Sequence, residues 1–235
     1  MNTIQYKKLN LESNQLILDM GCGEGRHSIG ALLETPANVI GLDLSVQDLK
    51  IAKHRLNDFD LSDINAFCTF GVGNINDIPI KNASLDAVMC SEVLEHVDSP
   101  EESIHELVRV LKPGGVMALS VPRYLPELIC WKLSKEYSQT PGGHVRIFRH
   151  RQLKDLAVNA GLEYQSFHWA HGLHSPYWWL QCMFWKTKET SYIVNLYHKL
   201  LVWDLMKKPL LTKIFEAILQ PLIGKSLVMY FKKPI

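Results

Sequence analysis

Residues 16–30 of the chain read Leu-Ile-Leu-Asp-Met-Gly-Cys-Gly-Glu-Gly-Arg-His-Ser-Ile-Gly. In this stretch an apolar run is followed by three glycines at alternate positions, Gly21, Gly23 and Gly25. Glycine lets the backbone turn tightly and still leaves room for a ligand against the main chain. The helix that we expect after Gly25 would present free N–H groups, which favour anionic ligand groups. The stretch therefore predicts a nucleotide-cofactor site at the end of the first strand of a doubly wound α/β sheet.

The spacing of the glycines bears on which nucleotide cofactor binds. The dinucleotide fingerprint G-x-G-x-x-G would place its third glycine at Arg26, where close helix–strand packing is needed, so a nicotinamide dehydrogenase is disfavoured. A pyrophosphate would not favour Glu24 inside the loop, whereas a cofactor with an ammonium group tolerates Asp19 and Glu24 nearby. S-adenosylmethionine (SAM) carries such a group. At Leu18–Gly25 the chain resembles the class I SAM-dependent methyltransferases.

Three further segments match this family in order. Val39–Ser45 has the pattern of a buried strand that ends in an acid. That acid, Asp43, lies about twenty residues beyond the glycines, where an acid hydrogen-bonds ribose hydroxyls in nucleotide-binding folds. Gly73–Pro79 precedes the expected fourth strand, and Val110–Ser120 matches the family's fifth strand with the turn before it.

The resemblance implies a set of cofactor-binding residues. In the family, the residue after the glycine that corresponds to Gly73 is usually an Asp, which binds the adenine amino group. Here that residue is Asn74, whose amide oxygen can accept the same hydrogen bond. An alternative is a doubly wound domain that binds no SAM, or binds it without turnover. The expected cofactor-binding residues are Asp19, Gly21, Gly23, Gly25, Asp43, Leu44, Asn74, Ile75 and Cys90.

Strand and helix patterns alternate along the chain. We expect strands at residues 15–20, 38–42, 66–71, 85–90, 116–121, 163–169 and 226–231, and helices at residues 26–33, after the capping Ser45, at 100–111 and at 151–160. Right-handed helical crossovers would join the parallel strands. The prediction is a Rossmann-like α/β fold, a doubly wound, mostly parallel seven-stranded sheet with a helical insertion before the last strand. Residues 1–235 would form a single SAM-dependent methyltransferase domain.

The expected insertion, residues 171–224, is rich in aromatic residues and lysines. It contains an amphipathic stretch around residues 192–206 and a second apolar helix near residues 210–219. Lysines beside Trp, Tyr and Leu suit a membrane interface, so one hypothesis is a peripheral membrane contact. The other, which we favour, is a helical lid whose aromatic side chains pack on the sheet. In both, this segment would shape the acceptor pocket.

Residues 91–97 read Ser-Glu-Val-Leu-Glu-His-Val. If they form a helical turn, Glu92, Glu95 and His96 share one face, and two carboxylates with an imidazole could bind Mg²⁺ or another divalent cation. The E-x-x-E-H pattern resembles that of the metal-dependent catechol O-methyltransferases of ubiquinone synthesis. It is also similar to the methyltransferases that modify the terminal 2′-hydroxyl of small RNAs. In both, a later histidine completes the metal site, and His144 stands in the matching place.

Two catalytic roles follow for the histidines of this motif. With a metal bound, an acceptor hydroxyl would lose its proton more easily and be aligned with the sulfonium methyl group. Relatives with Glu-His after the fourth strand and no known metal also exist. Without a metal, His96 and His144 are the leading general-base candidates, because imidazole titrates near neutral pH.

The composition indicates which classes of partner to expect and in which cellular compartment the protein works. The chain has 25 Lys and Arg against 24 Asp and Glu, so we expect no nucleic-acid partner. Its five scattered cysteines indicate a reducing cytoplasm. No run reaches the about 18 apolar residues that span a bilayer, and Met1–Leu11 lacks the apolar core of a signal peptide. We expect a cytoplasmic protein, associated with membranes only through the insertion.

These observations predict a SAM-dependent methyltransferase that acts on an oxygen atom of a small-molecule, glycan or lipid-linked acceptor. The alternatives are a metal-independent C- or N-methyltransferase, and a non-catalytic SAM-binding protein.

Overall fold

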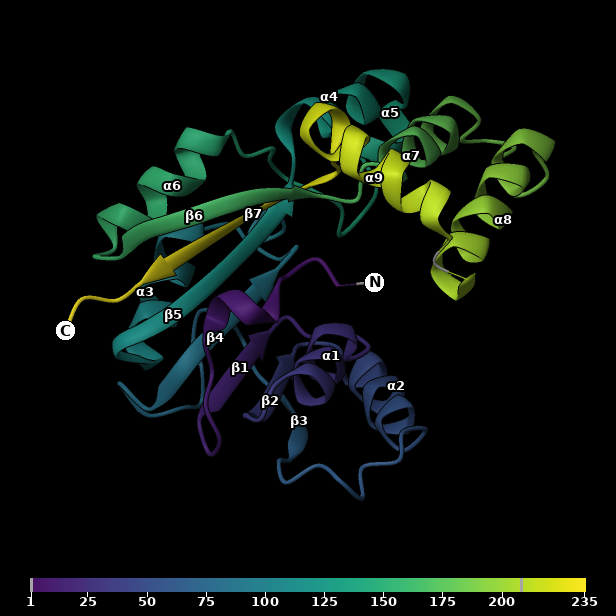
Figure 1. Cartoon of the computed structure of the whole chain (residues 1–235). Helices are drawn as coiled ribbons and strands as arrows, with labels where there is room; N and C mark the ends of the chain where they lie inside the picture. Colours follow the sequence, from purple (N-terminus) through teal and green to yellow (C-terminus); the bar gives the residue numbers. More distant parts are fainter. Residues whose placement is uncertain (1, 208) are drawn as a thin grey trace.

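A seven-stranded sheet runs through the molecule in the computed structural model, which describes residues 2–207 and 209–235 (Figure 1). The strand order is β3-β2-β1-β4-β5-β7-β6, and β7 runs antiparallel to both of its neighbours. This arrangement confirms the predicted doubly wound, mostly parallel sheet. The strands are β1 Leu16–Met20, β2 Asn38–Asp43, β3 Cys68–Val72, β4 Leu85–Ser91, β5 Leu111–Pro122, β6 Glu163–Ala170 and β7 Ser226–Lys232.

Helices cover both faces of the sheet and one of its ends (Figure 1). The 3₁₀ helix η1 (Tyr6–Leu9), α1 (Arg26–Glu34) and α2 (Val46–Leu56) lie on one face, and α3 (Pro100–Val110) and α6 (His150–Asn159) on the other. The remaining helices gather beyond the carboxyl end of β5. They are α4 Tyr124–Leu133, α5 Lys135–Ser138, α7 His174–Met183, α8 Tyr192–Lys207 and α9 Leu210–Ile223.

The central strands are apolar on both sides because hydrophobic clusters cover both faces of the sheet. In β1, Leu18 and Met20 pack into the cluster that contains α3 and α6, whereas Ile17 packs into the cluster that contains η1 and α1. Strands buried on both faces read as continuous apolar runs, which made β1 and β4 readable from sequence. The α2 helix begins as predicted, because the Ser45 hydroxyl accepts a hydrogen bond from the Asp48 backbone N–H at 3.2 Å.

Two segments differ from the expected elements. We expected no helix between the fifth strand and residue 151, but α4 and α5 lie there, within residues 124–138. The fifth strand was expected from residue 116, yet β5 begins at Leu111, because the backbone of Gly114 and Gly115 pairs with Lys233 just beyond β7. The predicted insertion before the last strand is confirmed as α7, α8 and α9. Within the described residues, no helix combines the length and the apolar character needed to cross a bilayer.

Candidate functional site

The glycine turn after β1 has the backbone conformation that its sequence predicts. Gly21, Gly23 and Gly25 have φ angles of +73°, +50° and +80°, in the left-handed region that favours glycine. A Cβ atom on Gly21 would lie 2.2 Å from Cγ2 of Val93, so packing alone requires glycine there. A Cβ atom on Gly23 would meet nothing within 4 Å. The space in front of Gly23 is therefore open for a ligand that contacts the main chain.

Two acidic residues support this turn in different ways. Asp43, at the end of β2, accepts hydrogen bonds from the backbone N–H groups of Gly23 at 2.7 Å and Ser45 at 2.8 Å. Asp43 thus links the glycine turn to the start of α2, and each of its carboxylate oxygens keeps a lone pair for a ligand hydroxyl. Asp19 is 1% exposed and accepts a hydrogen bond from the Ser28 hydroxyl at 2.6 Å. Burial raises the pKa of Asp19 to about 6, against the lowering effect of Ser28.

The other expected cofactor residues fall into an exposed pair and a buried pair. Leu44 is 65% exposed next to Asp43, and Asn74 is exposed with its side-chain oxygen accepting from the Asn76 backbone N–H at 3.0 Å. Ile75 and Cys90 lie in the core, so a ligand would meet their backbone rather than their side chains. The glycine turn, Asp43 and Cys90 come from the carboxyl ends of β1, β2 and β4, which are adjacent strands.

The segment after β4 is a tight turn and not the start of a helix. β4 ends at Ser91, Glu92 has a φ of +57°, and one turn follows at residues 94–96. The left-handed backbone at Glu92 directs its side chain to Ser120, whose hydroxyl donates to Oε1 of Glu92 at 3.0 Å. The expectation that Glu92, Glu95 and His96 share a helical face is therefore wrong.

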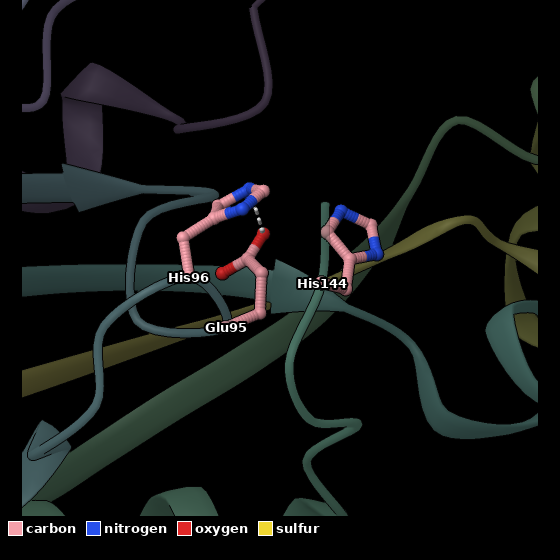
Figure 2. A group of neighbouring side chains, drawn as sticks. All are labelled: Glu95, His96 and His144. Carbon is pink, nitrogen blue, oxygen red and sulfur yellow. Dashed lines mark ion pairs between the residues drawn. The ribbon is translucent and has the colours of Figure 1, made fainter. Parts of the chain in front are cut away.

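Glu95, His96 and His144 nevertheless come together (Figure 2). Each offers a ligand atom, and these atoms lie within 4.8 Å of one another. The Glu95 side chain is buried, and neither of its carboxylate oxygens has a hydrogen-bond partner among the described residues. Nε2 of His96 lies 4.0 Å from Oε1 of Glu95. Burial raises the pKa of Glu95 well above its ordinary value, and the nearby Glu92 raises it further.

Both histidines are oriented through their Nδ1 atoms. Nδ1 of His144 lies 2.7 Å from Oε1 of Glu127, and Nδ1 of His96 lies 3.1 Å from the carbonyl oxygen of Gly143. Because each of these acceptors requires the N–H on Nδ1, the Nε2 atom of each ring is left as the basic nitrogen. Histidines that bind metals are usually fixed in this way, with the second nitrogen donating to a carboxylate or a carbonyl.

Glu127, on α4, was missed by the sequence analysis. It is 2% exposed, and its Oε1 also accepts hydrogen bonds from the Tyr137 hydroxyl at 2.9 Å and the Trp131 indole at 3.1 Å. Burial raises the pKa of Glu127, but the hydrogen bonds and the charge of His144 lower it more, so the net pKa lies below its ordinary value. The signal for Glu127 was a lone acid in the apolar stretch 124–133.

The loop that carries His144 is tied to the turn that carries Glu95 and His96. The backbone N–H of Val145 donates to the carbonyl of Glu95 at 2.9 Å. The Arg146 guanidinium donates to the carbonyls of Leu94 at 3.2 Å and Asp98 at 2.8 Å. Arg146 is therefore engaged in holding the two segments together.

The donor set and its burial fit a divalent cation. A carboxylate oxygen and two imidazole nitrogens suit Mn²⁺, Fe²⁺ or Zn²⁺, and the open side at His96 leaves positions for further ligands. An unpartnered buried carboxylate is costly, and a cation beside it would remove that cost. Glu92, the fourth ligand expected from the sequence, lies outside this group and is bound to Ser120.

Two neighbouring cavities lie between Glu92 and the α9 helix. One of about 350 Å³ is lined by Arg26, Glu92, His171, His174 and Leu205, among others. A larger one, of about 1040 Å³, lies between α1 and α9 and shares Arg26 and Leu205 with the first. Shared lining residues make the two cavities adjacent, so a ligand near Glu92 could extend toward α9.

The sequence is similar to that of known methyltransferases. Residues 18–119 match a family described as a methyltransferase domain. The ubiquinone biosynthesis O-methyltransferase of Azoarcus sp. (strain BH72) is 31% identical over 156 residues, which cover 64% of this chain and 65% of that protein. The demethylmenaquinone methyltransferase of Oceanobacillus iheyensis is 28% identical over 180 residues, covering 67% of this chain and 73% of that protein. The match covers only 40% of the length of a Streptomyces halstedii methyltransferase and 46% of that of a Streptomyces fradiae transposon protein. The chain thus spans about half the length of these two relatives.

Solved structures share the fold. A SAM-dependent methyltransferase from Methanosarcina mazei superposes with a TM-score of 0.66 at 16% identity, and the match covers 100% of both chains. A geranyl diphosphate methyltransferase in complex with SAM gives a TM-score of 0.62 at 17% identity, covering 97% of this chain and 82% of that one.

Proposed function

We propose that this chain, which belongs to the class I SAM-dependent methyltransferases, transfers the SAM methyl group to a hydroxyl oxygen with the help of a divalent cation. The acceptor class that we propose is a small-molecule, glycan or lipid-linked hydroxyl compound. The observation that carries the proposal is the buried Glu95 carboxylate, which has no hydrogen-bond partner in residues 2–207 and 209–235 and lies beside His96 and His144.

The residues at the carboxyl ends of β1 and β2 would hold the cofactor. SAM supplies an electrophilic methyl group on a sulfonium. The open main chain at Gly23 would lie against the cofactor, and Asp43 would accept hydrogen bonds from its ribose hydroxyls. Leu44 would cover the nucleoside with its exposed side chain, and Asn74 would accept from the adenine amino group. Asp19 would contribute indirectly, because its buried carboxylate accepts a hydrogen bond from the Ser28 hydroxyl on α1.

Glu95, His96 and His144 would hold the cation. When bound, a divalent cation lowers the pKa of an acceptor hydroxyl and fixes its position. Glu127 holds the His144 ring in the tautomer with a free Nε2, and Gly143 does the same for His96. Alignment of the two reactants is most of what this transfer requires, and it can contribute roughly 7–11 kcal/mol in favourable cases. The binding of loop 142–146 to the turn at residues 94–96 provides the rigidity that alignment needs.

A cation-free reaction is the second candidate, and the His144–Glu127 pair favours it. A histidine whose Nδ1–H is held by a carboxylate is an oriented general base. In this version His144 or His96 removes the acceptor proton through Nε2. This version corresponds to a metal-independent C- or N-methyltransferase, and a demethylmenaquinone methyltransferase is among the proteins similar to this chain.

Calorimetry and product analysis together test the proposal. We expect S-adenosylhomocysteine to bind the full chain, and labelled SAM to label a low-molecular-weight or lipid fraction of a cell extract. Labelling should stop in chelator and return with Mn²⁺, Mg²⁺ or Zn²⁺. Labelling that persists in chelator would favour the cation-free reaction. Binding of S-adenosylhomocysteine without any labelling would indicate a non-catalytic SAM-binding protein, and folded protein that gives no binding heat would overturn the proposal.

Matched variants separate the metal ligands from general surface effects. Glu95→Gln and His144→Ala should abolish the labelling that added metal restores, while S-adenosylhomocysteine binding stays intact. His54→Ala, at an exposed position of α2, is the control and should behave like the wild type.

A further inference from the structure

The α8 helix has one face packed on the molecule and an opposite face that is apolar and exposed. Val194 and Leu201 are buried, and the Tyr197 hydroxyl donates to the Leu173 carbonyl at 3.0 Å, so this side faces α7. The helical period of 3.6 residues places a second set of large side chains on the outer side. The exposed members of this set are Tyr192, Ile193, Leu196, Leu200, Trp203 and Met206.

The α9 helix repeats this arrangement. Thr212 is buried, and Glu216 accepts hydrogen bonds from the backbone N–H groups of Gly172 and Leu173 at 2.8 Å each, so this side faces inward. The outer side exposes Leu210, Leu211, Ile214, Phe215, Ile218 and Leu222. Monomeric proteins rarely leave apolar patches of more than a few hundred Å² uncovered, so the outer faces of both helices indicate a partner.

The charges around these faces are of one sign. The acids of the two helices are used internally: Asp204 accepts a hydrogen bond from the Thr212 hydroxyl, and Glu216 binds the start of α7. Lys199, Lys207 and Lys213 are exposed on the same helices. An apolar face bordered by lysines and interrupted by Trp and Tyr matches the interface of an anionic bilayer.

We propose that α8 and α9 lie together in the headgroup region of an anionic phospholipid membrane, with their outer faces against the acyl chains. Neither helix spans the bilayer, because no described helix has the necessary length and apolar character. A second copy of this chain fits the surface less well, since pairing two such faces would bring lysines against lysines. The membrane contact does not depend on the metal or on the identity of the acceptor.

Co-sedimentation with vesicles tests the membrane contact. The full chain should sediment with equimolar phosphatidylcholine and phosphatidylglycerol vesicles, less with phosphatidylcholine alone, and less at high salt. The double variant Ile214→Gln/Ile218→Gln should remain in the supernatant, because it removes apolar side chains from the outer face of α9. Lys199→Gln and Lys213→Gln should each weaken binding to anionic vesicles by about fivefold.

Controls keep the outcome interpretable. Val158→Gln on α6 replaces an exposed β-branched apolar residue by Gln, and Lys53→Gln on α2 replaces an exposed Lys by Gln; both should sediment like the wild type. S-adenosylhomocysteine binding by every variant reports that the chain is folded. The proposal is overturned if the wild type stays in the supernatant with anionic vesicles, or if the α8–α9 variants bind as tightly as the controls. The proposal is also overturned if the wild type is a dimer in the absence of lipid and the double variant is a monomer, because that result would indicate self-association through these faces.

Discussion

Three buried carboxylates near the carboxyl edge of the sheet are compensated in three different ways. Asp19 is neutralised in part by a proton, since burial raises its pKa to about 6. Glu127 is compensated by hydrogen bonds from His144, Tyr137 and Trp131. Glu95 has no hydrogen-bond partner among the described residues, lies beside His96 and His144, and has its pKa raised well above the ordinary value by burial. Of the three, Glu95 is the carboxyl group that no hydrogen bond from a described residue compensates, which is why we propose it as a cation ligand.

Glu127 should act as a positioning residue for His144. Glu127→Gln keeps the size of the side chain but removes the charge that favours the Nδ1–H tautomer, so we expect metal affinity to fall by about 10- to 100-fold. Calorimetry with Mn²⁺ on protein saturated with S-adenosylhomocysteine measures this loss. Glu136→Gln on α5 is the matched control, because Glu136 is exposed. Unchanged Mn²⁺ affinity in Glu127→Gln would show that the charge is not needed.

Asp19 should make stability depend on pH. Folding raises its pKa from 3.8 to about 6, so the folded chain binds this proton more tightly than the unfolded chain. Its contribution to the free energy of unfolding therefore falls as the pH rises through this window, by about 3 kcal/mol in total. Asp19→Asn should lack that loss, and urea unfolding of both proteins at several pH values measures it. The exposed Asp63→Asn should follow the wild type; parallel pH profiles for wild type and Asp19→Asn would contradict the assignment.

In the glycine turn after β1, replacing glycine by alanine should mainly lower stability at position 21 and mainly weaken ligand binding at position 23. Gly21→Ala places a Cβ atom 2.2 Å from Val93, so it should lower the melting temperature strongly. Gly23→Ala meets open space and should cost about 1 kcal/mol of stability from its positive φ. It should nevertheless weaken S-adenosylhomocysteine binding at least tenfold, because the methyl group occupies the ligand's place. Thermal unfolding and calorimetry measure the two effects, and equal affinity of Gly23→Ala and wild type would contradict this role.

The elements also show which physical signals a sequence carries. β1, β2 and β4 were predictable because both faces of the central strands are largely buried, which gives mostly apolar stretches of sequence. α4 was not, because its stretch 124–133 is apolar on most sides and has Pro126 in the first turn, so no helical period stands out. The turn at residues 94–96 was taken for a helix because spacing alone cannot reveal the left-handed backbone at Glu92.

The site was predictable only where its residues belong to a linear sequence pattern. His144 and the pair Glu95–His96 were found from a linear pattern, and the structure brings them together across 48 residues of chain. Glu127 completes their surroundings through a contact between α4 and the loop at residues 142–146, and no linear pattern encodes it.

At the scale of the whole molecule, two adjacent cavities lie between the apolar helices and Glu92 at the end of β4. The cavity of about 1040 Å³ between α1 and α9 shares Arg26 and Leu205 with the cavity of about 350 Å³ that includes Glu92. Leu205 lies on the inner side of α8, opposite the outer face that carries Leu196. An acceptor held in a membrane by its lipid tail would meet these two adjacent cavities, which share Leu205, between α9 and the end of β4.

Leu205→Trp should narrow that path without touching the cofactor residues. We expect labelled SAM to label the lipid-soluble fraction of a cell extract severalfold more slowly with this variant, because the larger ring fills space where the two cavities meet. S-adenosylhomocysteine affinity should stay at the wild-type value, since Leu205 lies on α8 and not at the glycine turn. Leu196→Trp makes the same change on the outer face of α8, where it should leave labelling unchanged and preserve vesicle binding. Equal labelling rates for Leu205→Trp and Leu196→Trp would mean that the acceptor reaches Glu92 by another route.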